Sequence, residues 1–572
     1  MLFPRMKVTP SQAAALTSFG GLDLRGGAAE GTFRHMENMT AADWPALSVR
    51  APRGTVAVLD APNGLTAKDA PVWVDGTALY INGLSAGLTL TDSPKQLVSM
   101  GSYLLIWPDK VYINTADWSD CGSMEHTVTL TGGVSFAPCA ADGTALSYTT
   151  AAAPPEDASQ GALWLDTAAT PPILRQYGVG GWETAAGACL RLCAVGVDSG
   201  FSAGDAVELS GFTAGVLNGS FPVLSAQEDA LILSAPPVSG TQSGTVTLAR
   251  TVPDMDFVVE CGNRLWGCKY GLVGGESVNE IYASKLGDFK NWHCFAGLST
   301  DSYAASRGSD GVFTGAAVVL GSPVFFKEEC MERVYPAASG AHRIVTLACQ
   351  GIRKGSGASA AAVNGVLYYH APGGVYAYSG SMPVCVSQAL GQETYHGAVG
   401  GALGGEYYVS MADSRGAYHL ICYDTARKLW HRQDDTRAVA FAACDGELLC
   451  LDGDSGAVLA LHGRAGTPES TVSWEAQSGD WWMKEAHSST LRRLTIRARL
   501  APEAVMHAEL SYDGGVTWLP QGTVTGGGTE IERRTVHVRP RRCRQVRLRL
   551  RGTGQVTVYS VTALRGKESE TP

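Results

Sequence analysis

The chain has 572 residues, more than one compact core usually holds, so we expect about three domains. Hydrophobic residues make up 45% and charged residues 17%, with 69 glycines; this composition excludes intrinsic disorder and favours an all-β protein with many turns. A net charge of −10 excludes a protein that binds DNA over its whole surface, although local basic faces stay open.

Residues 1–50 form the first predicted unit, an N-terminal arm. Paired glycines and prolines favour an extended course, with one helical turn at residues 33–39. We expect a strand from this arm to close the domain that follows it.

Residues 51–118 are predicted to begin a β-propeller. Asp75-Gly76 separates two runs of alternating apolar and polar residues, which is a strong hairpin signal. A second hairpin turns at Pro108-Asp109. Two strand pairs in succession are typical of propeller blades.

Residues 119–252 interrupt the propeller. Alanine, threonine, glycine and proline become frequent, and Asn218-Gly219 marks a turn between two strand-like runs. We interpret this segment as an inserted small β module that projects from the propeller.

Residues 253–466 resume the hairpins and are predicted to be the second part of the propeller. Equivalent positions near Tyr335, Tyr376, Leu420 and Val458 recur about every 40 residues, the length of one four-stranded blade. A lone hairpin cannot bury its apolar face, whereas blades stacked in a ring cover one another. We therefore expect an all-β fold built on a propeller of six to eight blades.

Residues 467–572 are predicted to form a C-terminal β-sandwich. Leu494, Ile496 and Ala498 alternate with Arg493 and Arg497, the pattern of a strand with one buried and one exposed face.

Cysteine usage and hydropathy limit the remaining classes. The 14 cysteines show no zinc-ligand spacing, and Cys422 and others lie in apolar runs, so we expect reduced thiols packed in the core. No apolar run reaches the roughly 18 residues of a membrane-spanning helix, and the first residues lack a signal peptide. We expect no cofactor, no metal and no membrane contact.

One run in the second propeller part carries a resemblance. Asn263-Arg-Leu-Trp266, Asn279-Glu-Ile-Tyr-Ala-Ser-Lys285 and the following Gly287 to Trp292 segment are similar to the propeller of tail hub and nozzle proteins of short-tailed phages, including packaged-DNA stabilisation proteins. The arm run Phe19-Gly-Gly-Leu-Asp23 resembles the opening of the same proteins. The residues we assign as a structural fingerprint are Asn263, Trp266, Asn279, Ile281, Tyr282, Asp288, Trp292, Asp513 and Trp518.

The resemblance implies a structural virion protein without enzymatic activity. Such a chain would be made in the cytoplasm of a bacterial host and would reside in the virion tail. It would assemble as a six-membered homo-oligomeric ring beneath a tail adaptor or portal-proximal protein, around the channel through which DNA is ejected. Contact with the genome would be blind to sequence.

Arginines crowd a stretch of about twenty residues near the C-terminus and form the strongest charge feature. They suit either a solvated strand face or a patch that meets an acidic partner or DNA phosphates. The members of this predicted patch are Arg533, Arg534, Arg539, Arg541, Arg542, Arg544, Arg547, Arg549 and Arg551.

Two other function classes stay open. Ser511-Tyr-Asp-Gly-Gly-Val-Thr-Trp518 matches the Asp-box of sialidases once, a motif that is itself a hairpin turn. A sialidase-like or glycan-binding propeller is therefore one alternative, and a receptor-binding tail-tip protein is another. A sialidase also needs an arginine triad, a tyrosine nucleophile and a carboxylate, and no such set is evident in the sequence, so we expect no catalytic residues.

Overall fold

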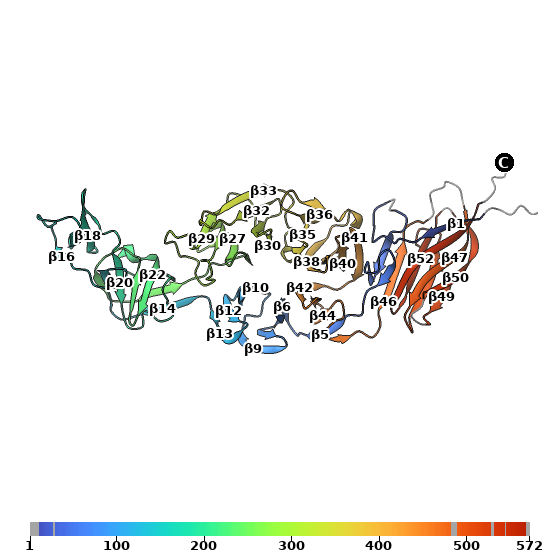
Figure 1. Cartoon of the computed structure of the whole chain (residues 1–572), viewed down its shortest axis with the longest axis horizontal. Helices are drawn as coiled ribbons and strands as arrows, with labels where there is room; N and C mark the ends of the chain where they lie inside the picture. The colour runs from blue at the N-terminus through green and yellow to red at the C-terminus, as the bar shows by residue number, and fades with distance from the viewer. Residues whose placement is uncertain (1–10, 27–28, 482–488, 528–530, 544, 568–572) are drawn as a thin grey trace, which may run out of the picture.

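The computed structural model describes residues 11–26, 29–481, 489–527, 531–543 and 545–567. Within these ranges the regular secondary structure is almost all β-strand and there is no α-helix, which confirms the predicted all-β class. Three short 3-10 segments occur, at Gly215–Leu217, Gly357–Ser359 and Gln388–Leu390. Figure 1 shows an elongated molecule in which the propeller sheets lie between an inserted module at one end and a β-sandwich at the other. No helix in the described part of the chain is long and apolar enough to cross a membrane.

Small antiparallel sheets follow one another and make up the β-propeller; we number them sheets 1 to 7 within the described residues. Sheet 1 consists of β6 (Pro62–Lys68), β7 (Ala70–Asp75), β8 (Ala78–Ile81) and β9 (Leu84–Thr89). Sheet 2 consists of β10 (Gln96–Met100), β11 (Tyr103–Trp107), β12 (Val111–Asn114) and β13 (Asp117–Ser123). Sheet 3 consists of β26 (Phe257–Glu260), β27 (Leu265–Val273), β28 (Glu276–Ala283) and β29 (Tyr303–Ser306). Sheets 4 and 5 consist of β30 (Gly315–Val319), β31 (Ser322–Phe326), β32 (Cys330–Tyr335) and β33 (Arg343–Ala348); and β34 (Ala361–Val363), β35 (Val366–Ala371), β36 (Gly374–Tyr378) and β37 (Val384–Cys385). Sheets 6 and 7 consist of β38 (His396–Leu403), β39 (Glu406–Ala412), β40 (Tyr418–Asp424) and β41 (Leu429–Asp434); and β42 (Ala438–Cys444), β43 (Glu447–Asp452), β44 (Ala457–Ala460), β5 (Gly54–Val58) and β45 (Thr467–Pro468).

These sheets close into a ring because each buries an apolar face against the next. The first strands of neighbouring sheets touch in succession from β6 through β10 and β26 to β30, and again from β34 through β38 and β42 back to β6. The 3-10 segment Gly357–Ser359 touches β30 of sheet 4 and β35 of sheet 5, and so spans the step between these two sheets. Apolar clusters fill the spaces between sheets, for example Val72 and Leu79 of sheet 1 with Leu104 and Ile113 of sheet 2.

The ring is closed by a strand from the N-terminal side of the chain. β5 lies directly after the arm and pairs antiparallel with β44 of sheet 7. The last sheet is thus built from residues nearly four hundred positions apart in sequence, which ties the two ends of the propeller together.

The inserted module leaves the propeller between sheets 2 and 3. Sheet 2 runs to Ser123, five residues beyond the boundary at 118 that we expected. The module enters at His126 and leaves at Arg250, which are register partners in one strand pair, so its two ends lie side by side. Its strands are β14 (His126–Leu130), β25 (Val246–Arg250), β21 (Ala206–Ser210), β22 (Gly219–Gln227), β23 (Ala230–Leu233), β20 (Cys189–Cys193), β15 (Val134–Cys139) and β24 (Gly240–Gln242), with a separate sheet of β16 (Thr149–Ala151), β17 (Leu163–Asp166), β18 (Ile173–Gly178) and β19 (Gly181–Thr184).

The C-terminal sandwich takes strands from both ends of the chain. One sheet has the order β3 (Met39–Thr40), β4 (Leu47–Val49), β52 (Val556–Lys567), β47 (Ser489–Leu500) and β50 (Glu532–Cys543), with β1 (Ser11–Leu16) also on β52; the other has β2 (Phe33–Glu37), β46 (Ser473–Ser478), β51 (Arg547–Thr553), β48 (Val505–Ser511) and β49 (Leu519–Thr525). We call them the β47 sheet and the β48 sheet. The arm therefore builds part of the sandwich as well as leading into the propeller.

The predicted helical turn at residues 33–39 is wrong, because this segment forms β2 and β3. Phe33 and Met36 are both fully buried, and their three-residue spacing imitates one helical turn. A register shift between Phe33 and His35 in the pairing with β46 turns both side chains toward the core of the sandwich. A β-bulge thus gives two buried residues a three-residue spacing without a helix.

Candidate functional site

A cleft of about 570 Å³ lies between the arm, sheet 5 and the connection from β37 to β38. Arg25 and Gly26 come from the arm, and the turn before Gly374 and the residues around Glu393 come from the propeller. The arm is fixed here because the Leu24 N–H donates to the Ala389 carbonyl at 2.7 Å and the Leu22 N–H donates to the Trp430 carbonyl. The cleft exists because the arm crosses this part of the propeller.

Glycine and serine shape the floor of the cleft. The Ser387 hydroxyl accepts a hydrogen bond from the Val375 N–H at 2.8 Å. Gly374 has a φ of +122°, and a Cβ there would collide with the Ser387 oxygen. The backbone consequently approaches the serine as only glycine allows.

Charged groups lie at the rim. Arg25 donates from Nε and Nη2 to the two carboxylate oxygens of buried Asp23, at 2.9 and 2.7 Å, and this hydrogen bonding lowers the pKa of Asp23. Hydrogen bonds from Ser414, including its N–H at 3.0 Å, lower the pKa of the exposed Glu393 carboxyl. Glu393 is therefore an ionised acceptor at neutral pH.

Neutral groups lie deeper. His370 is 1% exposed, its Nδ1 lies 3.1 Å from the Ser356 hydroxyl, and burial lowers its pKa to about 4. Burial raises the pKa of Tyr395 to about 12. With Gln388 and Gln392, the lining combines neutral donors and acceptors with one anion and one cation, a set suited to hydrogen-bonding a hydroxyl-rich ligand.

Several fingerprint residues of the second propeller part pack between or beside the propeller sheets. Trp266 and Ile281 are fully buried between sheets 3 and 4, Tyr282 packs between sheets 2 and 3, and Trp292 donates from Nε1 to the Phe289 carbonyl at 2.9 Å. Asn263 takes a φ of +59° in the turn between β26 and β27.

Two asparagines of the same run bind neighbouring segments. Asn279 donates from Nδ2 to the Arg307 and Ser309 carbonyls. Asn291, fully buried beside Trp292, donates from Nδ2 to Asp205 at 2.8 Å and to Asp288 at 2.6 Å, and accepts from the Ala206 N–H. Sequence reasoning singled out this run but missed Asn291 and its role in fixing the inserted module.

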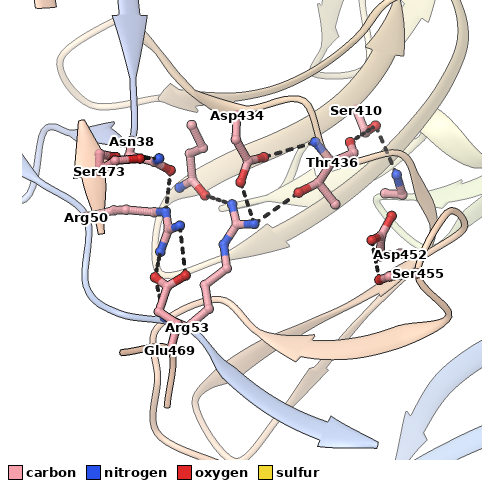
Figure 2. Close-up of polar contacts among 12 residues, drawn as sticks. Asn38, Arg50, Arg53, Ser410, Asp434, Thr436, Asp452, Ser455, Glu469 and Ser473 are labelled. Carbon is pink, nitrogen blue, oxygen red and sulfur yellow. Dashed lines mark hydrogen bonds and ion pairs between the residues drawn. The ribbon is translucent and has the colours of Figure 1, made fainter. Parts of the chain in front are cut away.

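A second polar junction, drawn in Figure 2, joins the sandwich to the propeller. Arg50 and Arg53 are 6% and 5% exposed. Arg50 pairs with Glu469 and donates from Nε to Asn38 at 2.7 Å; Arg53 pairs with Asp434 at 2.6 Å and donates to Thr436 at 3.0 Å (Figure 2). Two buried guanidinium groups thus stand between the arm, sheet 6 and the segment that leads to the sandwich.

The predicted arginine patch is divided between the two sheets of the sandwich. Arg533, Arg534, Arg539, Arg541 and Arg542 belong to β50, whereas Arg547, Arg549 and Arg551 belong to β51 of the other sheet, and Arg544 lies outside the described residues. On β51, Arg547 pairs with Asp480 at 2.8 Å, and Arg549 and Arg551 both pair with Glu509. The β51 arginines are thus already matched by carboxylates.

The single Asp-box forms the hairpin between β48 and β49. Asp513 accepts hydrogen bonds from the Thr517 N–H at 2.9 Å and from the hydroxyls of Thr517 and Ser511, which lower its pKa. Trp518 lies beneath the Arg549 guanidinium at 4.5 Å. The motif lies in the sandwich, outside the propeller.

Metal and thiol chemistry add nothing to this picture within the described residues. No group of three or more histidine, cysteine or acidic side chains is placed to hold a metal ion in that part of the chain. The thirteen cysteines described are free thiols, and burial raises the pKa of Cys139 and Cys349 to about 11.

Neither a protein-family model nor a curated protein matches the chain. Among solved structures, the exo-β-1,3-galactanase of Phanerochaete chrysosporium is 9% identical, with 54% of this chain and 94% of that chain covered and a TM-score of 0.22. The endosialidase of phage phi92 is 10% identical, with 83% and 65% covered and a TM-score of 0.21. The sialidase of Trypanosoma rangeli is 10% identical, with 96% and 95% covered and a TM-score of 0.20. Each score is too low to align a residue of this chain with an active site.

These similarities contradict one prediction. We expected a protein that is not an enzyme, whereas the solved structures to which the chain is similar are a galactanase, an endosialidase and a sialidase. The prediction that the chain lacks enzymatic activity is therefore withdrawn, and the all-β fold rests on the strands and sheets of the chain itself.

Proposed function

We propose that the chain recognises a glycan in the cleft between the arm, sheet 5 and the connection from β37 to β38. The observation that carries this proposal is the convergence of Arg25, Gln388, Gln392 and Glu393 on one cleft of about 570 Å³. Ligand pockets commonly occupy roughly 300–1,000 Å³ and orient a ligand with a few polar groups. Sugar hydroxyls both donate and accept, and this lining offers partners of both kinds.

Ionised Glu393 is the side chain on which the proposal depends most. A glycosidase of the two-carboxylate type needs one carboxyl group that stays protonated to act as general acid. Hydrogen bonds from Ser414 hold the pKa of Glu393 low, which suits acceptance from a sugar hydroxyl rather than proton donation. Binding and hydrolysis are thus separable and should be measured together.

The test uses the full chain and a panel of sialosides, galactans and xylans, with calorimetric titration and assay of released reducing sugar. We expect at least one saccharide to bind, and Glu393→Gln to weaken that binding about 10-fold, as loss of a charged hydrogen bond would. Glu276→Gln, at an exposed position on β28, is the matched control. Binding that survives Glu393→Gln, or no saccharide binding at all, would contradict the proposal.

We also propose, as a second candidate, that the chain is a ring-forming subunit of a phage tail hub or nozzle. Two buried polar junctions favour it: the one at Asn291 fixes the inserted module, and the one at Arg50 and Arg53 fixes the sandwich. A propeller with a rigidly attached module at each end is suited to be a subunit of a larger ring-shaped assembly. The ring would be a homo-hexamer in the virion tail, in contact with a tail adaptor or portal-proximal protein.

Native mass spectrometry and negative-stain images test this second candidate. They would be recorded for the purified chain alone and together with the proteins encoded next to it. A closed ring with an open lumen supports it. Monomers under both conditions count against it, and binding of the monomer to host cells would instead favour a receptor-binding tail-tip protein.

A further inference from the structure

The outward face of the β47 sheet carries an unbalanced row of arginines. On β47, Leu494, Ile496 and Ala498 are buried, so the alternate residues Arg493, Thr495, Arg497 and Arg499 point outward. Arg493, Arg497 and Arg499 are all exposed. Residues two apart on a strand are roughly 7 Å apart, so Arg497 and Arg499 are neighbours on this face, while Arg493 lies about 14 Å from Arg497 with Thr495 between them.

The neighbouring strands extend this face. Arg533 of β50 lies directly opposite Arg497 and is also exposed, and Thr535 lies opposite Thr495. On the other side of β47, Ser560 of β52 lies opposite Arg497. We call the four exposed arginines, Arg493, Arg497, Arg499 and Arg533, the arginine face.

Like charges directly across a strand pair destabilise a sheet, so the pair Arg497 and Arg533 needs a compensating partner. None of the four arginines has an ion-pair partner among the residues whose side chains the structure describes. Asp43 accepts a hydrogen bond at 3.1 Å from the hydroxyl of Thr557, which lies directly opposite Arg499, so one carboxylate stands beside this end of the face. Among the described side chains, the pair Arg497 and Arg533 thus carries a cost in stability that no ion pair offsets.

The other sheet of the same sandwich shows what a compensated face looks like. There Arg549 donates from Nε to Glu509 at 2.6 Å, Arg551 donates to the same carboxylate at 2.9 Å, and Glu509 is 4% exposed. Arginines of the β48 sheet are thus paired with a carboxylate, whereas those of the arginine face have no ion-pair partner among the described side chains. The arginine face is left positive in a chain whose net charge is −10.

We propose that the arginine face binds the phosphate backbone of double-stranded nucleic acid without reading sequence. Guanidinium groups bind phosphate oxygens in pairs, and the interspersed hydroxyls of Thr495, Thr535 and Ser560 are the other side chains that commonly contact phosphates. Arginine and hydroxyl side chains together are the combination that commonly contacts a phosphate backbone, which favours a nucleic acid over an acidic protein. This inference is independent of the glycan cleft, which lies at the propeller.

The experiment is fluorescence anisotropy of a labelled DNA duplex of mixed sequence, titrated with the full chain over a range of salt concentrations. Removal of one arginine that binds a phosphate should reduce the slope of log K against log salt by about 0.9. Arg497→Gln with Arg533→Gln should therefore flatten the slope by about 2 and weaken binding about 10-fold at moderate salt. Arg343→Gln with Arg415→Gln, two exposed arginines of the propeller, is the control with the same change of charge.

Melting temperatures show whether a variant loses DNA binding only because it has unfolded. Removal of the like-charge pair Arg497 and Arg533 should leave the melting temperature unchanged or raise it. No DNA binding by the wild-type chain overturns the proposal, as does an equal loss in the control variant. Tighter binding of polyglutamate or alginate that depends on the same two arginines would also overturn it, because the occupant would then be a protein or an acidic polysaccharide. Saccharide binding in the cleft should be unchanged in the variant with Arg497→Gln and Arg533→Gln.

Discussion

At the scale of single residues, the buried charges at the junction between arm and propeller decide how the modules are held. Burial alone would raise the pKa of Asp434, but the Arg53 guanidinium and hydrogen bonds from Thr436 outweigh it and hold this pKa below its usual value. The fold therefore favours the ionised form of the Asp434 carboxyl. Its stabilising contribution is present above the unfolded pKa and is lost as the pH falls below about 4.

Replacement of Arg53 by methionine should lower the free energy of unfolding by about 3–5 kcal/mol, because it leaves the Asp434 carboxylate buried without its partner. Urea denaturation followed by circular dichroism measures the change. Arg437→Met is the control, since its pair with Asp454 is exposed and should contribute under about 1 kcal/mol. Equal losses in the two variants would refute a special role for the junction. The double variant with Asp434→Asn should recover part of the loss.

His370 should make the chain sensitive to mild acid. Its pKa falls from 6.5 to about 4 on burial, so between those pH values the unfolded chain binds a proton that the folded chain does not. Stability should therefore fall by up to about 3 kcal/mol as the pH drops through this window and should not depend on His370 above it. Urea denaturation at both ends of the window, with His370→Gln for comparison, measures the difference. A pH dependence unchanged in the variant would assign the effect to other groups, such as buried His431.

At the scale of elements, strands from distant parts of the chain complete one another's sheets. Hairpin signals worked well for local pairs: Asp75 ends β7 and Ala78 begins β8, as the Asp75-Gly76 pattern predicts. β5 has no such signal, because its partners β44 and β45 lie about four hundred residues away. β5 instead packs closely at Gly54, where an added Cβ would collide with the Ala465 carbonyl oxygen.

Gly54→Ala should therefore destabilise the closed propeller by about 1–3 kcal/mol, the range found when a well-packed site is overfilled. The midpoint of urea unfolding measures it. Gly308→Ala is the control, because nothing lies within 4 Å of a Cβ at that position. Wild-type stability in Gly54→Ala would show that β5 can move away from the β45 side without cost.

At the scale of the whole molecule, the arm makes the two ends of the chain interdependent. The core of the sandwich merges with that of sheets 5 and 6, where Tyr368, Tyr407 and Trp430 share one cluster with Leu494 and Leu548. β1 to β4 come from residues 11–49, so a fragment of residues 467–572 would lack part of both sandwich sheets.

We expect that fragment to remain unfolded, with poorly dispersed amide NMR signals, because it would expose the apolar faces that β2 and β4 cover. The same fragment fused through a flexible linker to residues 11–50 should show dispersed signals. A well-dispersed spectrum from the fragment alone would show that the sandwich is an independent domain.

The class of fold and much of the local structure could be predicted from the order of the amino acids. Alternation of apolar and polar residues is a property of neighbouring positions, so strands, hairpin turns, the recurring unit of the propeller, and the inward side of β47 could be predicted. The Asp-box could be interpreted as a turn for the same reason, since its hydrogen bonds join residues within four positions of one another.

Which distant segments meet could not be predicted and is known from the three-dimensional fold. The cleft needs the arm to lie across sheet 5, the two junctions pair residues such as Arg50 and Glu469 that are 419 positions apart, and the arginines of one sequence stretch divide between two sheets. Long-range pairing depends on the summed burial of whole faces rather than on any local pattern. For that reason the arginine face, which joins β47 to β50, could not be found by counting arginines along the chain.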